Sequence, residues 1–148
     1  GALETVKKLG WAPDIVHCHG WMSSLVPAYI KTTYKNDPTF KNSKVVYSIY
    51  EDCFEEKLNA NFAKKAVMAN MTEEDTKAFL PSDCNSMHIG AVTHSDAVVL
   101  ADENLDKDVL KFVKDSNKPT LAFNLTENFE NFYSFYEEIS NDELVSVA

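Results

Sequence analysis

The chain has 148 residues, of which 45% are apolar and 25% are charged, the ordinary composition of one globular domain. Its formal net charge is −9, and all 14 basic residues are lysine. An acidic chain without arginine is poorly suited to nucleic acid or to an anionic membrane surface. No apolar run approaches the roughly 20 residues of a membrane-spanning helix. We therefore expect neither nucleic acid nor a membrane as a partner.

The composition also argues against nucleotide binding. The 4 glycines lie far apart, at Gly1, Gly10, Gly20 and Gly90, so they do not form the glycine-rich loop that cradles a diphosphate. Arginine, whose planar fork binds phosphate through two hydrogen bonds, is absent. We expect this chain, taken alone, to hold no nucleotide, no other cofactor and no metal. Because the sequence begins with glycine rather than methionine, we also expect further residues before it.

The three cysteines, Cys18, Cys53 and Cys84, are odd in number and widely spaced. That pattern argues against a disulfide framework and favours the reducing cytoplasm. No secretion signal is visible at the start of the sequence, which agrees with a cytoplasmic location. Cys53 follows Glu51 and Asp52, whose negative charges disfavour a thiolate, so we do not expect it to act as a nucleophile.

Apolar periodicity and capping residues divide the chain into alternating helices and strands. In chain order, the pattern predicts a helix at 3–9, a strand at 14–18, a helix from Ser23 or Ser24 to about 34, a strand at 44–50, helices at 61–69, 72–79 and 83–94, a strand at 96–101, a helix from Asp106, a strand at 119–123 and a last helix. The last helix carries an aromatic stripe, which we interpret as core packing against a sheet rather than as a ligand box. The stripe consists of Leu125, Phe129, Phe132, Tyr133 and Tyr136.

Alternating strands and helices predict an α/β fold, a three-layer, Rossmann-like parallel sheet with helices on both faces. Each strand is an almost continuous apolar run, as expected of parallel strands that are buried on both faces. Residues 1–148 are expected to form a single domain, since no linker, repeat or low-complexity segment interrupts the pattern. Ligands of such sheets bind at the carboxyl ends of the strands. We therefore expect His17, Tyr50, Ala101 and Phe123 near one edge, with the site beside them.

The end of the first strand carries the sharpest candidate site, in the sequence His17-Cys18-His19-Gly20-Trp21. The two histidines alternate along the strand, so they share one face if the strand persists that far. An imidazole can hydrogen-bond a sugar hydroxyl, and an indole can pack on the face of a pyranose ring. His17, His19 and Trp21 are therefore candidate substrate-binding residues. The alternative is a packed strand end with a core tryptophan.

Other reactive side chains favour structural roles. A zinc site made of the two histidines and the Cys18 between them is disfavoured, because neighbouring residues of a strand point to opposite faces. The acidic run after the second strand is either an acid/base pair or cation site or, as we prefer, a solvated loop. This run contains Glu51, Asp52, Glu55 and Glu56. Cys84 is expected far from any strand end, and we interpret His88 and His94 as packing or surface residues of a helix.

Residues 11–29, with the sequence WAPDIVHCHGWMSSLVPAY, carry a recognisable pattern. They resemble the bacterial glycogen synthase and starch synthase family, in its motif Pro-Asp-(Ile/Val)-(Ile/Val)-His-x-His-Asp-Trp followed by a helix with Val/Ala-Pro-x-Tyr. Residues 40–49 stand where that family places its next strand, and residues 95–99 resemble its later Ala-Asp-x-(Ile/Val)-x-(Ala/Val)-Ser strand. The strong similarity covers about 40 residues near the start of the chain.

The resemblance implies a retaining glucosyltransferase that moves glucose from ADP-glucose to the non-reducing end of an α-1,4-glucan. Such enzymes place the active site between two Rossmann-like domains in the GT-B arrangement, and the chain resembles the later part of the N-terminal catalytic domain. The second histidine of the motif, here His19, touches the donor sugar and supports catalysis in that family. The expected partners are an α-glucan or ADP-glucose at this site, with a second copy of the chain or a missing second domain.

The chain also departs from the family pattern. Gly20 replaces the aspartate of the motif, and the family's Thr-(Ile/Val)-His-Asn after the second strand reads Ser48-Ile49-Tyr50-Glu51. The family's acceptor segment, its Lys-x-Gly-Gly loop and its second domain have no counterpart in this sequence, so we expect the chain alone to be inactive. Two alternatives stay open: a non-catalytic relative that binds glucan or a partner protein, and a flavodoxin-like or response-regulator-like domain. The latter lacks the clustered acids that a receiver domain needs for Mg²⁺.

Overall fold

The protein is described from a computed structural model that covers residues 1–145, with side chains described up to Asn141. Four strands form one sheet: β1 (Ile15–His19), β2 (Lys44–Ile49), β3 (Ala97–Leu100) and β4 (Thr120–Leu121). The α-helices are α1 (Ala2–Leu9), α2 (Leu25–Lys31), α3 (Phe62–Ala66), α4 (Glu73–Thr76), α5 (Cys84–His94), α6 (Lys107–Asp115) and α7 (Phe129–Val145). Short 3-10 helices cover Trp21–Ser23, Lys77–Phe79 and Phe123–Leu125.

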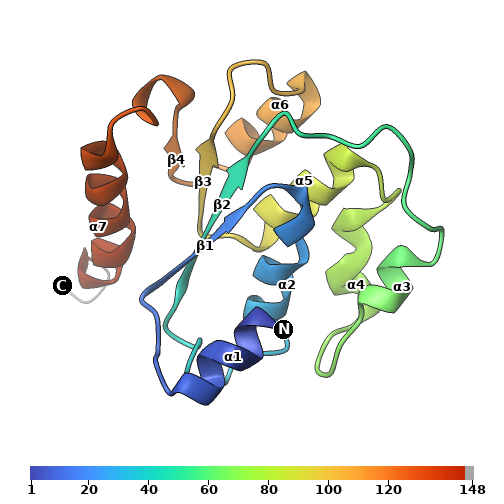
Figure 1. The fold of residues 1–148 in the computed structure, drawn as a ribbon, viewed down its shortest axis with the longest axis horizontal. Helices are drawn as coiled ribbons and strands as arrows, with labels where there is room; N and C mark the ends of the chain where they lie inside the picture. The colour runs from blue at the N-terminus through green and yellow to red at the C-terminus, as the bar shows by residue number, and fades with distance from the viewer. Residues whose placement is uncertain (146–148) are drawn as a thin grey trace.

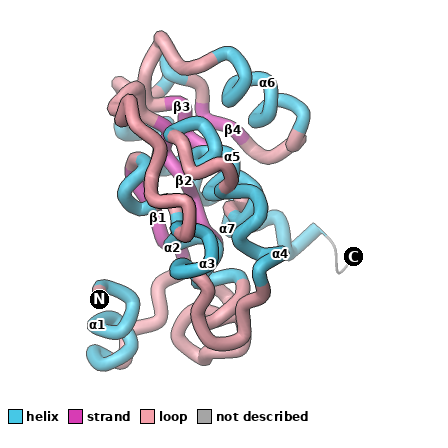
Figure 2. The backbone as a smooth tube through the Cα atoms, turned by 90° about the vertical axis from the view of Figure 1, so that its right-hand side faces the viewer, coloured by secondary structure: helices cyan, strands magenta, loops and turns pink. Residues whose placement is uncertain are grey.

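All strand pairs are parallel, in the order β1-β2-β3-β4. Each strand lies beside the next one in the chain, so every crossover moves along the sheet in the same direction. Right-handed crossovers of this kind place all their helices on one face of the sheet. The connecting helices α2, α5 and α6 accordingly pack on one face, whereas α7, which follows β4, covers the other (Figure 1). The strands lie in the middle, with α1 and α6 near opposite ends of the molecule (Figure 2). The three-layer, Rossmann-like α/β fold predicted from the sequence is confirmed.

Alternation along the strands divides the core into two clusters, one on each face of the sheet. Val45, Tyr47 and Val98 face α2, α5 and α6, and their side chains are fully buried. Val46 and Val99, each one position further along its strand, face α7 instead. Because both faces are covered, the central strands β2 and β3 are apolar along most of their length rather than alternating in polarity.

The buried stripe of α7 differs from the predicted one. The side chains that pack against the sheet are Phe132, Phe135, Tyr136 and Ile139. Phe129 is 87% exposed, Tyr133 is 71% exposed and Leu125 is 43% exposed, so the predicted core role is wrong for these three. At 3.6 residues per turn, positions 132, 135, 136 and 139 form one narrow stripe, and positions 129 and 133 lie to its side. No helix of the described residues is long and apolar enough to span a membrane.

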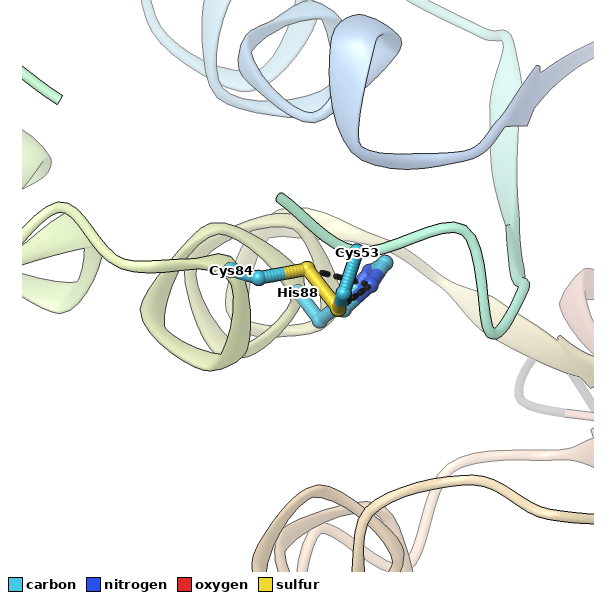
Figure 3. Close-up of side chains that lie close together, drawn as sticks. All are labelled: Cys53, Cys84 and His88. Carbon is cyan, nitrogen blue, oxygen red and sulfur yellow. Dashed lines mark hydrogen bonds between the residues drawn. A yellow bond between two sulfur atoms is a disulfide. The ribbon is translucent and has the colours of Figure 1, made fainter. Parts of the chain in front are cut away.

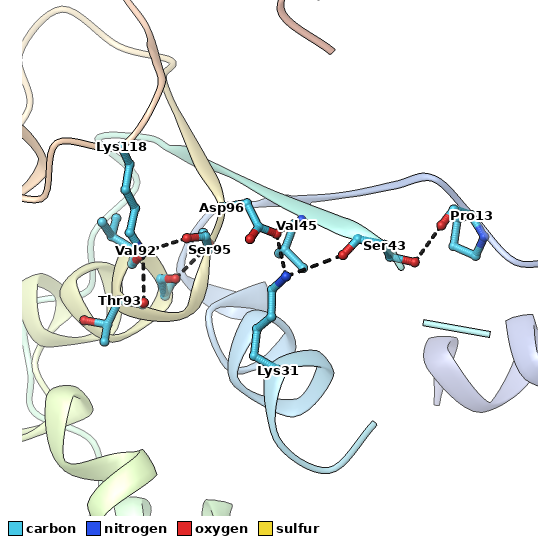
Figure 4. Close-up of polar contacts among 10 residues, drawn as sticks. Pro13, Lys31, Ser43, Val45, Val92, Thr93, Ser95, Asp96 and Lys118 are labelled. Atoms are coloured by element: carbon cyan, nitrogen blue, oxygen red, sulfur yellow. Dashed lines mark hydrogen bonds and ion pairs between the residues drawn. The ribbon is translucent and has the colours of Figure 1, made fainter. Parts of the chain in front are cut away.

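Two lysines fasten helices to the amino end of the sheet (Figure 4). Lys31 Nζ of α2 lies 2.6 Å from the Asp96 carboxylate, which also accepts a hydrogen bond from the Val45 N–H at 2.6 Å. Lys118 Nζ donates to carbonyl oxygens at the end of α5, where the helix leaves its last carbonyls without intrahelical partners. These acceptors are Val92, Thr93 and Ser95, at 2.5, 2.9 and 2.6 Å. These contacts fill the amino end of the sheet, and ligands of parallel sheets bind at the carboxyl end.

Cys53 and Cys84 form a disulfide bond, so the expectation of unpaired cysteines is wrong for these two residues. Cys53 lies in the loop after β2, and Cys84 is the first residue of α5. The chain between them passes through α3 and α4 and returns, which brings residues 31 positions apart to a Cα–Cα distance of 5.6 Å. Cys84 therefore lies beside the end of β2 rather than far from any strand end. The remaining cysteine, Cys18, is unpaired and buried.

Candidate functional site

His17 and His19 lie on one face of β1, because the strand continues as far as His19. Their imidazole rings stack, with 4.1 Å between the ring centroids and 24° between the ring planes. β1 pairs with β2 over its whole length, and His19 lies opposite Ser48 near the carboxyl end of both strands. The prediction that the two histidines share a face is confirmed.

His17 is held at both ring nitrogens. Its Nδ1 lies 2.5 Å from the Tyr136 hydroxyl of α7, and its Nε2 lies 2.7 Å from Ser48 Oγ of β2. Burial, together with the neighbouring His19, lowers the pKa of His17 to about 4. A neutral imidazole donates from one nitrogen and accepts at the other, and a hydroxyl can take either part. His17 is therefore neutral at pH 7 and fixed in orientation, which suits it to position His19.

His19 is the exposed member of the pair. Its Nδ1 lies 3.0 Å from the Tyr50 hydroxyl, and partial burial lowers its pKa. Within residues 1–141, the side-chain hydrogen bonds of His19 engage Nδ1 alone. The stacked pair thus presents the other ring nitrogen, Nε2, from a rigid strand as a group that can bind a polar ligand.

Gly20 turns the chain sharply after β1. Its φ of 68° and ψ of 172° belong to a region that glycine alone occupies readily. Its N–H donates to the Ser48 carbonyl at 3.1 Å, and a Cβ at this position would lie 3.2 Å from Asp52 Oδ2. Backbone conformation and nearby charge both favour glycine at the position where the family motif carries aspartate.

Trp21 lies apart from the histidine pair. Its indole packs against Phe54, with 4.6 Å between the ring centroids, in a cluster that apolar residues between positions 54 and 79 form with residues of α2 and α5. Cys18 belongs to the core on the opposite face of β1 from the histidines, where burial raises its pKa to about 12. The structure therefore brings His17 and His19 together and places Trp21 and Cys18 among packed side chains.

Ser48, Tyr50 and Tyr136 complete the site, and their place in it is not evident from the sequence alone. Tyr136 is 119 positions from His17, and no local pattern shows that α7 returns to β1. Ser48 and Tyr50 do leave a signal. Ser48 lies in β2, opposite His19, and Tyr50 directly follows the strand two positions later. Residues two positions apart share a face, so Ser48 and Tyr50 are expected on the face that carries the histidines.

Two cavities border this edge of the sheet. One, of about 370 Å³, lies along the free side of β1 and is lined by His17, His19 and Ser23 with apolar residues of α1 and α2. The other, of about 510 Å³, lies beyond the ends of β2 and β3, between the starts of α5 and α6. The histidine pair borders the first cavity, and the Cys53–Cys84 disulfide borders the second.

The other candidate side chains take the structural roles expected of them. The acidic loop residues Glu51, Asp52, Glu55 and Glu56 are exposed, as in a solvated loop. His88, 2% exposed, lies with its Nδ1 2.8 Å from the Tyr47 hydroxyl. His94 Nε2 donates to the Asp75 carbonyl at 2.9 Å. Both histidines lie in α5, His88 buried and His94 half-buried.

Comparison with known proteins agrees with the pattern of the first strand. The profile of the starch synthase catalytic domain matches residues 1–118. The chain is 35% identical over 96 residues to a glycogen synthase of Chlorobium phaeovibrioides, and 29% identical over 107 residues to one of Clostridium perfringens. A shorter stretch of 50 residues is 50% identical to a glycogen synthase of Chlorobium luteolum. No solved structure matches the chain.

The chain spans only a small part of these relatives. The matched segments cover 65% of the chain and 19% of the Chlorobium phaeovibrioides protein, 72% and 22% for Clostridium perfringens, and 34% and 10% for Chlorobium luteolum. The family profile nevertheless covers most of the sequence, including β1, β2, β3 and the helices between them. The chain therefore belongs to the starch synthase catalytic domain family, which its glycogen synthase relatives share.

Proposed function

We propose that this chain is the later part of the N-terminal catalytic domain of a GT-B glucosyltransferase. The reaction of that enzyme transfers glucose from ADP-glucose to the non-reducing end of an α-1,4-glucan, with retention of the anomeric configuration. The observation that carries the proposal is His19, an exposed imidazole that β1 holds at the carboxyl end of a parallel sheet, stacked on a fixed partner. It stands at the second histidine of the family motif.

In this proposal, His19 binds a hydroxyl of the donor glucose through Nε2, while Tyr50 holds Nδ1. His17 acts as a positioning residue, because its own nitrogens are engaged by Tyr136 and Ser48. Both rings have lowered pKa values through burial, so both are neutral near pH 7. A neutral imidazole is a suitable hydrogen-bond partner for an uncharged sugar, since it imposes no buried charge.

We propose that the chain alone is inactive, because it lacks the groups that stabilise the donor diphosphate. Open α/β sheets bind their ligands where the strand order reverses, and the order β1-β2-β3-β4 does not reverse among the described residues. Within those residues β1 has a strand neighbour on one side alone. A partner strand beyond β1 and a second, nucleotide-binding domain are the parts that the proposed reaction requires. We place this reaction in the cytoplasm, where nucleotide-sugar donors are made.

A second candidate function is favoured by the departures from the family motif. Gly20 takes a backbone conformation that aspartate does not readily adopt, and Tyr50 and Glu51 replace the family's histidine and asparagine. A relative that has lost catalysis keeps the fold and the exposed His19, and then binds the end of a glucan, or a partner protein, without turnover.

Two measurements separate these functions. First, the purified chain is assayed for transfer of labelled glucose from ADP-glucose to glycogen, and for maltooligosaccharide binding by calorimetry. We expect no transfer by the chain alone under either function. Maltooligosaccharide binding that His19→Ala weakens and His94→Gln leaves unchanged supports the second function, because the first assigns His19 to the donor glucose. Measurable transfer by the chain alone would overturn the proposed inactivity.

Second, residues 11–50 replace the corresponding segment of the Clostridium perfringens glycogen synthase. Retained glucosyl transfer by this chimera, lost again on His19→Ala, supports the catalytic assignment. A folded chimera that binds maltooligosaccharide but transfers no glucose supports the non-catalytic one.

A further inference from the structure

Cys53, Cys84 and His88 lie close together (Figure 3). They line the second cavity, which His17 and His19 do not line. Cys84 and His88 lie one turn apart on α5, and Cys53 reaches them from the loop after β2. Their two sulfur atoms and the imidazole Nε2 all lie within 4.8 Å of one another. We propose that these three side chains form a site for a thiophilic divalent cation, with Zn²⁺ as the favoured ion. Reduction of the disulfide makes both sulfur atoms available as ligands, and formation of the disulfide removes them.

The distances fit such an ion. In a tetrahedral zinc site with Zn–S near 2.3 Å and Zn–N near 2.0 Å, a sulfur and a nitrogen ligand lie about 3.5 Å apart, and two sulfurs about 3.8 Å apart. His88 Nε2 lies 3.5 Å from Cys84 Sγ and 3.9 Å from Cys53 Sγ. The nitrogen is thus already at ligand spacing from both sulfurs. The sulfurs alone must separate, and Cys53 lies in an exposed loop that can yield.

The surroundings of His88 also suit a ligand. A histidine that binds metal through Nε2 must carry its proton on Nδ1 and usually donates it to a neighbouring oxygen. His88 Nδ1 lies 2.8 Å from the Tyr47 hydroxyl, which is buried beneath the ring. Tyr47 therefore fixes the orientation of the ring, and its hydroxyl can accept the Nδ1 proton in the tautomer that leaves Nε2 for the cation.

Charge and access complete the argument. The cavity of about 510 Å³ is lined by both cysteines and His88, and its charged lining side chains are the carboxylates Glu51, Asp83 and Asp106. A cation paired with two thiolates is neutral overall, and surrounding carboxylates favour it further. The protein supplies three ligands, and the open cavity lets water or a small ligand take the fourth position, as in zinc sites with three protein ligands.

Opening the site is a two-electron reduction. A dithiol reductant attacks one sulfur of the Cys53–Cys84 bond to give a mixed disulfide, and its second thiol then displaces the protein sulfur. The reductant leaves as its own disulfide, and each protein cysteine ends as a thiol. Zn²⁺ then replaces the two thiol protons, which pass to solvent. In the reverse exchange, a small-molecule disulfide takes two electrons from the two thiolates and leaves as two thiols; the Cys53–Cys84 bond re-forms, both sulfur ligands are lost and the cation is released.

The test uses the whole chain, reduced with a thiol-free phosphine and titrated with Zn²⁺ against a chromogenic chelator. We expect one Zn²⁺ per reduced chain and at least a 100-fold weaker affinity after oxidation. Co²⁺ in place of Zn²⁺ should give the strong visible bands of tetrahedral coordination and a thiolate charge-transfer band. No binding by the reduced chain, or equal binding by the oxidised chain, overturns the proposal.

Variants locate the ligands. Cys53→Ser and Cys84→Ser should each weaken Zn²⁺ binding at least 100-fold. His88→Asn removes Nε2 but keeps a polar atom near the Tyr47 hydroxyl, and should weaken binding at least tenfold. His94→Gln, a histidine change elsewhere on the same helix, is the control and should leave binding unchanged. If His88→Asn does not fold, Cys53→Ser in the exposed loop decides, since wild-type affinity in that variant overturns the site.

Discussion

The rings of His17 and His19 stack at 4.1 Å between centroids, yet the two residues differ in what surrounds them. His17 is hydrogen-bonded at both nitrogens, to Tyr136 and to Ser48, whereas His19 is exposed and hydrogen-bonded at Nδ1. One ring is therefore part of the packing between β1, β2 and α7, and the other is presented to ligand. The two histidines share one face of β1, and their different positions along the strand give them different environments.

The first prediction separates the two roles by substitution. His19→Ala should change the free energy of unfolding by no more than about 0.5 kcal/mol, because the side chain is exposed. If the chain is the non-catalytic relative, His19→Ala should also weaken maltooligosaccharide binding. His17→Ala should lower the free energy of unfolding by about 1–3 kcal/mol, because the buried Ser48 hydroxyl loses its partner.

Urea unfolding and carbohydrate titration of the two variants measure both effects. Unchanged binding in His19→Ala together with a large loss of stability would refute the site and leave His19 as a packing residue. Equal stability losses in both variants would show that the exposed position of His19 is wrong.

The second prediction concerns pH. The pKa of His17 in the folded chain is about 4, below its usual value of 6.5, and His19, His88 and His94 are shifted in the same direction by burial. Between these values the unfolded chain binds more protons than the folded chain, so the free energy of unfolding increases with pH. Stability should therefore be fully present above pH 6.5 and decline as the pH falls towards 4.

Urea unfolding at about pH 7, 6.5 and 6 measures this slope, well above the ordinary pKa values of carboxylates, about 4. His17→Gln removes one titrating group and should flatten the slope relative to the wild-type chain. Tyr133→Phe, a change at an exposed residue, should leave it unaltered. A wild-type slope in His17→Gln would show that His17 is not the buried neutral group described above.

The sequence predicts the central strands well because β2 and β3 are buried on both faces and so carry almost continuous apolar runs. Lys44–Ile49 and Ala97–Leu100 lie within the predicted ranges, and Thr120–Leu121 is a shorter version of its prediction. The parallel direction of the strands also follows from the alternation with helices. The histidine pair could be predicted because residues two positions apart on one strand share a face, whatever the rest of the chain does.

What the sequence does not reveal are contacts between distant segments. Tyr136 reaches His17 across 119 positions, and Cys53 reaches Cys84 only because the chain leaves the sheet and returns. Trp21 is adjacent to the histidines in sequence, but Gly20 turns it into a different cluster with Phe54. Such placements depend on how whole elements pack, which no local spacing encodes.

The third prediction tests Gly20 against the family motif. Gly20→Ala should lower the free energy of unfolding by about 1–3 kcal/mol, because its φ of 68° and ψ of 172° are strained for any side chain. Gly20→Asp should lose more, since its carboxylate would face Asp52, and the additional loss should disappear in the double variant with Asp52→Asn. Gly10→Ala is the control. Gly10 also has a positive φ, of 67°, but no atom lies within 4 Å of its Cβ position.

Thermal and urea unfolding of these variants measures the losses. A stability of Gly20→Asp equal to that of the wild-type chain would show that the turn relaxes to accept the family's aspartate. In that case the replacement of aspartate by glycine would not affect stability, and the catalytic function would be favoured over the non-catalytic one.

The fourth prediction concerns Gly90, in the middle of α5. An alanine normally stabilises a helix interior relative to glycine, by up to about 1 kcal/mol. Here a Cβ would lie 2.3 Å from Cδ1 of Phe79, whose ring is fully buried against the helix. Overpacking of this kind costs about 1–3 kcal/mol, so Gly90→Ala should lower the free energy of unfolding despite its helix propensity.

A double-mutant cycle identifies the cause. In a chain that carries Phe79→Leu, the smaller side chain leaves room for the Cβ, so adding Gly90→Ala should be neutral or stabilising. Thr93→Ala, on the exposed side of the same helix, is the matched control and should change stability by no more than about 0.5 kcal/mol. If Gly90→Ala destabilises equally with phenylalanine or leucine at position 79, the ring contact is not the reason for glycine. The close approach of Phe79 to α5 would then be refuted, and with it the packing of the Lys77–Phe79 3-10 helix against α5 at Gly90.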